Sequence, residues 1–255
     1  MKKKGIALVE RQYLFPFVLI TSLFFLWGFA HAILDVLNKH FQELLTITRT
    51  HSAMIQATMY MGYFIMAIPA GLFINRHGYR KGVVLGLLLY GIGSLLFIPG
   101  QYIASFNMFL FSLFVIGCGL TFLETAANPY VTELGARETA ASRLNFAQSF
   151  NGLGCIFAPI LTGLLLFSDE DKGASGNVAL PYAVMGVIVL LAALAFMRVR
   201  LPEIPHEEEV DSEGHRVGLW AHKLFVFGLV ALFAYEVSEI SINSFFINYV
   251  TEVGW

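Results

Sequence analysis

Charge is scarce in this chain of 255 residues, and its scarcity excludes most soluble architectures. Asp, Glu, Lys and Arg make up 13% of the residues, against roughly 25% in soluble domains. Apolar residues make up 57% and fall in long uninterrupted blocks, which is more apolar surface than the polar residues of a single soluble domain could cover. The composition therefore predicts a protein that lies in a lipid bilayer.

Several other features are missing. The net charge is −2 and the basic residues are scattered, so nothing predicts binding to nucleic acid. The only two cysteines, Cys118 and Cys155, stand in apolar blocks without a neighbouring Cys or spaced His, which favours buried thiols over a disulfide or a metal site. No GxxxxGK phosphate motif supports coupling to ATP. We expect neither a cofactor nor a metal.

Stretches without formal charge predict an all-α chain with seven spans, because a spanning helix needs about 20 apolar residues. The 42 uncharged residues between Lys81 and Glu124 would form a helix of about 63 Å at 1.5 Å per residue, so they must hold two spans. We expect the break at Pro99-Gly100-Gln101 and Ser105-Phe106-Asn107. The other spans are expected at residues 13–34, 50–75, 144–168, 180–197 and 222–250. Close helix packing is the expected role of Gly82, Gly86, Gly117 and Gly119.

Basic residues predict the orientation of these spans. With the N-terminus inside, the cytoplasmic segments hold 13 Lys and Arg residues and the opposite side holds 3, which the positive-inside rule favours. The start of the chain imitates a cleaved signal peptide, but its apolar run exceeds the usual 7 to 15 residues and more spans follow, so we expect an uncleaved span. We divide the chain into a six-span bundle (1–199), an acidic cytoplasmic linker (200–221) and one further span (222–255).

Two carboxylates fall where lipid is expected. A charge at the centre of a spanning helix costs about 2.5 to 3.5 kcal/mol and marks a function. Asp35 follows His31 by one turn at the end of the first span, and Glu124 precedes Asn128 by one turn within the fourth. Asp35 has the alternative of an interfacial position. Because burial favours the neutral carboxyl group, Glu124 or Asp35 is expected to take up and release a proton as water access changes sides.

Amides and an aromatic residue accompany these acids. The fifth span carries a polar stripe, and the seventh span carries a similar cluster, although amides in spans also serve to join helices. Sugars need hydrogen bonds for their hydroxyls and stack their C–H face on aromatic rings. Trp27, two turns before Asp35, is a candidate platform or, alternatively, an interfacial anchor. The polar stripe of the fifth span consists of Asn145, Gln148, Ser149 and Gly152. The cluster of the seventh span consists of Glu236, Glu239 and Asn243.

Four segments resemble known families. Gly71-Leu-Phe-Ile-Asn75-Arg76-His-Gly78-Tyr-Arg80-Lys81 resembles the signature loop of the major facilitator superfamily. The other three resemble the fucose:proton symporter family, over residues 14 to 250. They are Phe24-Phe-Leu-Trp27-Gly28 leading to Asp35, Leu123-Glu124-Thr-Ala-Ala-Asn128-Pro129-Tyr130, and Arg143-Leu-Asn145-Phe-Ala-Gln148-Ser-Phe-Asn151.

The resemblance implies a site between two six-span halves. Asp35 and Glu124 stand at the family's proton-coupling and sugar-binding acids, and Gln148, Asn151 and Glu239 match further cavity residues. The full expected substrate-binding set is Trp27, His31, Asp35, Glu124, Asn128, Asn145, Gln148, Asn151 and Glu239, and the expected gating loop is Gly71, Asn75, Arg76, Gly78, Arg80 and Lys81.

At two places the chain departs from the family pattern. Asn75 replaces the acidic residue usual in the signature loop, which leaves a gate built on that carboxylate in doubt. His31 and Ala32 replace asparagines that are frequent in fucose carriers. Glucose, galactose and N-acetylglucosamine therefore stay open beside L-fucose as the substrate.

We expect a proton-coupled symporter of a neutral monosaccharide in the bacterial inner membrane, functional as a monomer and continuing for five more spans. A non-transporting sugar sensor is an alternative. A receptor or light-driven pump is disfavoured because the seventh span lacks a mid-helix lysine. An enzyme is disfavoured because the spans hold no Ser and His pair and no metal-spaced His set.

Overall fold

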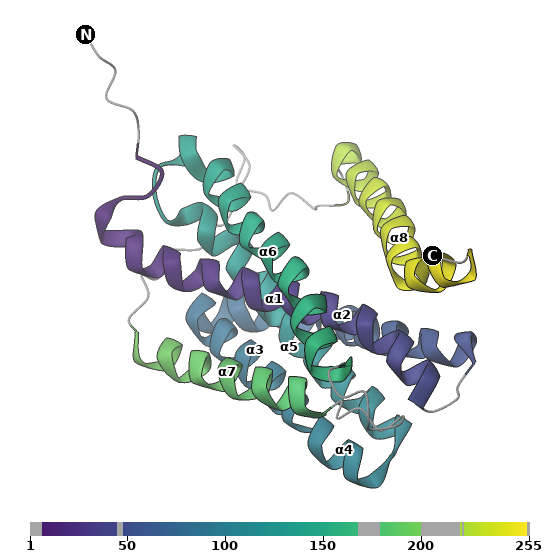
Figure 1. Ribbon diagram of the computed structural model, residues 1–255. Coiled ribbons are helices and arrows are strands. Elements are labelled where there is room, and N and C mark those ends of the chain that lie inside the picture. Colours follow the sequence, from purple (N-terminus) through teal and green to yellow (C-terminus); the bar gives the residue numbers. More distant parts are fainter. Residues whose placement is uncertain (1–6, 45–47, 168–178, 200–219, 221, 254–255) are drawn as a thin grey trace. The chain divides into compact units, whose positions relative to one another are not determined.

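The computed structural model describes residues 7–44, 48–167, 179–199, 220 and 222–253, and every regular element among them is helical. Figure 1 shows helices α1 to α7 gathered in one bundle. The helices are α1 Leu14–Leu44, α2 Arg49–His77, α3 Tyr79–Leu95, α4 Phe97–Ile103, α5 Phe106–Glu133, α6 Ala140–Phe167, α7 Ala179–Arg198 and α8 Lys223–Glu252. Short 3-10 turns, η1 Arg11–Tyr13 and η2 Arg137–Thr139, precede α1 and α6.

Six stretches within the described residues are long and apolar enough to cross a membrane, at 11–34, 51–77, 79–103, 106–133, 179–198 and 223–242. They match six of the seven predicted spans. The remaining one, α6, has the length of a span at 28 residues, and its amides lower the hydropathy of its first half. The prediction of an all-α polytopic chain is confirmed.

Two helices include residues that were expected at the limits of spans. Helix α1 continues to Leu44, nine residues past Asp35, because a charged residue does not end a helix by itself. Pro99, expected in a turn, lies in the first turn of α4, where a proline has no helical N–H bond to lose. The chain turns instead at Ala104, whose φ is 47°, and the Ser105 side chain then accepts from Met108 N and caps α5.

Glycines set the close helix crossings of the bundle. Helix α1 packs mainly on α6, α2 on α5, and α3 on both α5 and α7. A Cβ on Gly154 of α6 would lie 2.3 Å from the Phe25 carbonyl oxygen of α1, so only glycine permits this backbone approach. Gly86 and Gly119 face one another across α3 and α5 in the same way. The predicted close-packing role of Gly86, Gly117 and Gly119 is confirmed.

The chain divides into two compact units, residues 1–204 and 205–255. The second contains α8, which begins at Lys223 and ends at Glu252, close to the predicted span of 222–250. The acidic linker predicted at 200–221 lies almost wholly outside the described residues, so its boundaries stay predictions. Trp27, Glu124 and Gln148 all belong to the first unit.

Candidate functional site

An aromatic cluster joins α1 to α2. It consists of Trp27 and His31 on α1 with Tyr60 and Tyr63 on α2, all partly buried. The His31 ring centroid lies 5.9 Å from Trp27, 5.8 Å from Tyr63 and 6.3 Å from Tyr60. The Trp27 Nε1–H donates to the Tyr63 hydroxyl at 3.1 Å, and the Tyr63 oxygen lies 3.4 Å from His31 Nε2. The one-turn spacing of Trp27 and His31 thus places both on one face of α1.

Glu124 on α5 is within electrostatic reach of this aromatic cluster through Tyr63. Its side chain is partly buried and close enough to Tyr63 for an electrostatic interaction. Close packing of α2 on α5 explains the proximity, because a Cβ on Gly62 would lie 2.7 Å from the Phe114 carbonyl oxygen and one on Gly117 would lie 2.3 Å from that of Met59. The acid predicted to couple protons is therefore within electrostatic reach of Tyr63, which accepts a hydrogen bond from the predicted sugar platform, Trp27.

Amides of α5 and α6 form a second polar group. Gln148 Nε2 donates to Asn128 Oδ1 at 3.4 Å, which leaves the Asn128 nitrogen and the Gln148 oxygen for other partners. Asn151 Nδ2 donates to the Phe24 carbonyl oxygen of α1 at 3.4 Å. Phe24 in turn lies 5.9 Å from Trp27, ring centroid to ring centroid. Helix joining and substrate binding are both compatible with these contacts.

Arg143 holds together one end of the bundle. It is fully buried, and it donates to the carbonyl oxygens of Val131, Thr132, Ala136 and Leu8 and to the Thr139 hydroxyl. These groups belong to the end of α5, the turn η2 and the segment before η1. One guanidinium thus ties together carbonyl oxygens from three segments, and two of them, those of Val131 and Ala136, also accept a backbone N–H.

Arg80 of the predicted gating loop likewise binds backbone carbonyl oxygens, in this case those of α7. Its guanidinium donates to the carbonyl oxygens of Phe196 and Met197, near the end of α7. The neighbouring Tyr79 ring lies 5.9 Å from Tyr130, beside the group bound by Arg143. We call Arg80 and Arg143, with the carbonyls that they bind, the arginine-capped end.

Comparison with known proteins settles the family. The sequence profile of the Major Facilitator Superfamily matches residues 17–255. The chain belongs to the major facilitator superfamily. A crystal structure of the Escherichia coli fucose:proton symporter superposes with a TM-score of 0.64 at 37% identity, over 75% of this chain and 50% of that one. A proton:xylose symporter at 16% identity and a TM-score of 0.63, over 75% of this chain and 45% of that one, shares the fold alone.

Three curated relatives are similar over nearly the whole chain. The glucose/galactose transporter of Brucella abortus is 35% identical over 95% of this chain and 60% of its own length. The L-fucose-proton symporter of Escherichia coli is 34% identical over 95% of this chain and 61% of its own, and that of Haemophilus influenzae is 36% identical over 97% and 64%. The chain thus spans about three-fifths of the length of these relatives.

Not every expected residue of this major facilitator chain joins the site. Asp35 lies in α1, but its side chain is outside the described residues. Asn145 is exposed on α6, with no contact that ties it to Asn128 and Gln148. Glu236, Glu239 and Asn243 lie on α8, in the other unit, and the Asn243 side chain is not described. Their roles stay predictions.

The remaining gating-loop residues lie around the junction of α2 and α3. Gly78, between the two helices, has a φ of 86° that favours glycine, and its N–H closes α2 on the Ile74 carbonyl oxygen. Gly71 lies within α2, and Asn75, Arg76 and Lys81 are exposed. A gating role for the loop stays a prediction.

Sequence reasoning missed Tyr60 and Tyr63. With Gln56 they recur at intervals of four and three residues in an uncharged span, so they lie on one face of α2. The polar stripe of the fifth span was recognised by the same kind of spacing, so this signal could have identified the stripe on α2 as well. The capping role of Arg143 was also missed, because in the sequence this residue contributes only to the predicted orientation and to a segment that resembles the symporter family.

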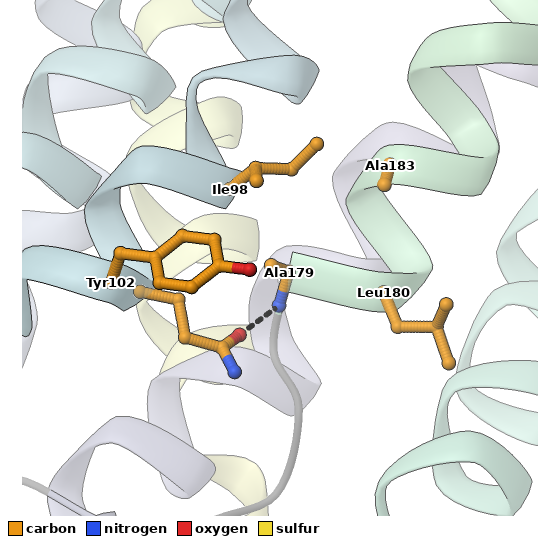
Figure 2. Close-up of a pocket in the computed structure, with 6 residues that line it drawn as sticks. Ile98, Tyr102, Ala179, Leu180 and Ala183 are labelled. Atoms are coloured by element: carbon orange, nitrogen blue, oxygen red, sulfur yellow. Dashed lines mark hydrogen bonds between the residues drawn. The ribbon is translucent and has the colours of Figure 1, made fainter.

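A cavity of about 450 Å³ between α4 and α7 lies apart from these residues (Figure 2). It is lined by Ile98, Gln101, Tyr102, Ala179, Leu180 and Ala183. The Gln101 Oε1 already accepts from Ala179 N at 2.8 Å, and the Tyr102 side chain is 87% exposed. The other lining side chains are apolar, so we assign no site to this cavity.

Proposed function

We propose that the protein is a proton-coupled carrier of a neutral monosaccharide that works by alternating access. One observation carries the proposal: Glu124, an acid in the interior of a spanning helix, is within electrostatic reach of Tyr63, which hydrogen-bonds Trp27 and contacts His31 in the aromatic cluster. Similarity to relatives that are named as sugar carriers supports it.

The chemistry of the groups fits such a substrate. A sugar offers an apolar C–H face and several hydroxyls, and it binds to aromatic surface flanked by fixed hydrogen-bonding groups. The cluster supplies the aromatic surface, while Asn128 and Gln148 retain unused amide capacity. Glu124 supplies a proton-binding group whose charge is costly within the membrane, so its protonation is a means of coupling.

We further propose that the N-terminus is cytoplasmic, in a bacterial inner membrane, and that the carrier acts as a monomer. The distribution of 13 basic residues on one side against 3 on the other supports the orientation. Labelling of single cysteines placed at Arg76 and Arg137 tests it, and both should react only from the cytoplasmic side.

L-Fucose is the first substrate to test, and D-glucose or D-galactose is the second. Fucose carriers are relatives at 34% and 36% identity. A glucose/galactose carrier at 35% identity and the His31-Ala32 departure from the fucose pattern favour the second. Competition of each sugar, and of N-acetylglucosamine, against radiolabelled uptake ranks them directly.

The decisive variant is Glu124→Gln in the full-length protein. It removes the titratable group with little change of shape, so sugar counterflow should persist while sugar-driven proton uptake falls to background. Glu133→Gln is the matched control, because Glu133 is an exposed acid at the end of the same helix, and its proton uptake should match the wild type. Unchanged alkalinisation by the Glu124→Gln protein would refute coupling at this residue.

A further inference from the structure

Three hydrogen bonds link the side chains of Trp27, Tyr63 and His31 and close on the backbone carbonyl oxygen of Trp27, and the donor of each can be assigned. An indole nitrogen can only donate and a carbonyl oxygen can only accept. Trp27 Nε1–H therefore donates to Tyr63, and His31 Nδ1, at 3.1 Å from the Trp27 carbonyl oxygen, must carry the hydrogen of that bond. In the neutral imidazole, Nε2 is then an acceptor, and the Tyr63 hydroxyl donates to it.

Each of these three residues uses a hydrogen-bonding group on another member of the set. The Trp27 N–H cannot serve a sugar hydroxyl without losing Tyr63, so what Trp27 offers a ligand is its ring surface. Tyr63 is the member that contacts both others, and it also lies within electrostatic reach of Glu124. It belongs to α2, whereas Trp27 and His31 belong to α1 and Glu124 to α5.

We propose that Tyr63 is a positioning residue for sugar binding, which holds the Trp27 indole and the His31 tautomer in place. The proposal rests on the proposed transport of a monosaccharide and names the residue that sets the shape of its site. A hydroxyl that accepts one bond and donates another from a rigid ring fixes two partners at once. Loss of that hydroxyl leaves the indole N–H and the imidazole nitrogen without their partners, which weakens a preorganised site.

The test is Tyr63→Phe in the full-length protein, with uptake measured across sugar concentrations. Phenylalanine retains the ring and its packing, so the maximal rate should stay within about twofold. The KM for the transported sugar should rise about tenfold, equivalent to 1.4 kcal/mol. Tyr102→Phe is the matched control, because it loses the same atom from a ring that is 87% exposed on α4, and its KM should not change.

A double variant separates positioning from a general structural effect. If Tyr63 acts through Trp27, then adding Tyr63→Phe to Trp27→Phe should raise the KM by less than twofold beyond Trp27→Phe alone. Independent, multiplying effects would overturn the proposal, as would a Tyr63→Phe protein with an unchanged KM. Should Tyr63→Phe not fold, Trp27→Phe probes the same bond from its donor side, and an unchanged KM there would equally overturn it.

Failure of the transport proposal can be distinguished from failure of the positioning role of Tyr63. A wild-type protein that takes up none of L-fucose, D-galactose, D-glucose and N-acetylglucosamine would overturn the transport proposal, and the positioning role with it. Wild-type uptake with an unaffected Tyr63→Phe protein would overturn the positioning role alone.

Discussion

The aromatic cluster and the arginine-capped end satisfy their polar groups in opposite ways. In the cluster, side chains bond to side chains: Trp27 donates to Tyr63, which lies against His31, and all three are partly exposed. At the capped end, Arg143 is fully buried and most of its acceptors are backbone carbonyl oxygens. A guanidinium does not lose its proton in a protein, and the carbonyls cannot move away from their helices.

This difference separates groups that can change partners from groups that cannot. Hydroxyl and imidazole groups can reverse the direction of a hydrogen bond when a proton or a ligand arrives. An arginine that binds the final carbonyls of a helix instead fixes where that helix ends. We expect variants of the arginine-capped end to lower stability with little effect on the KM of the folded protein. Variants of the aromatic cluster and of the amides Asn128 and Gln148 should raise the KM with little effect on stability.

The largest expected effect belongs to Arg143→Met. The substitution removes all five hydrogen bonds of a fully buried guanidinium, so the free energy of unfolding should fall by about 3 kcal/mol or more. Arg143→Lys should lose less, because it keeps the charge but not the planar fork of donors. Thermal unfolding in detergent of the purified wild type, Arg143→Met and Arg143→Lys proteins measures these differences in stability.

Arg198→Met is the control for this series, because Arg198 is exposed at the end of α7. Its unfolding midpoint should stay near that of the wild type. An Arg143→Met protein as stable as Arg198→Met would remove the contrast between the two regions.

Gly154→Ala has the second-largest expected effect and tests the crossing that carries the site. The new methyl would lie 2.3 Å from the Phe25 carbonyl oxygen, so α1 and α6 must separate, at a cost of about 1 to 3 kcal/mol. Gly152→Ala on the same helix meets nothing within 4 Å and should be neutral or stabilising by up to about 1 kcal/mol. The same change should thus have opposite signs two residues apart, as measured by thermal unfolding, and equal midpoints would contradict the observed approach.

The sequence predicted the spans because uncharged length is a direct requirement of the bilayer. It did not predict where helices end, since that depends on local conformation: α1 passes Asp35, and α4 contains Pro99 in its first turn. The packing role of Gly86 and Gly119 could be predicted, because close helix contact in membranes favours small residues.

The site was only partly predictable, for a different physical reason. One-turn spacing along α1 indicated that Trp27 and His31 share a face. The contact of Tyr63 with them joins residues 32 and 36 positions apart, and the bond from Arg143 to the Leu8 carbonyl oxygen joins residues 135 positions apart. Such contacts depend on how helices pack, and no pattern within a single span contains that information.

The smallest expected effect on stability belongs to Gln148→Met. Its bond to Asn128 is long, at 3.4 Å, and methionine fills a similar volume, so the free energy of unfolding should change by less than about 0.5 kcal/mol. Its effect on transport should be larger than this figure suggests, because a sugar hydroxyl then loses an amide partner, and the KM should rise by about tenfold. Uptake kinetics and thermal unfolding of one preparation give both values.

The same substitution at Gln101 is expected to have the opposite pattern, with an effect on stability and none on the KM. Gln101 Oε1 accepts from the backbone N–H of Ala179 at the start of α7, so Gln101→Met should lower stability by about 1 kcal/mol, as the loss of a helix cap does, without changing the KM. If instead Gln101→Met altered the KM and Gln148→Met altered only stability, the amides of α5 and α6 would be helix joints rather than sugar ligands. Among the described residues of α1, α2 and α5, the aromatic cluster and Glu124 would then remain as the proposed sugar-binding groups.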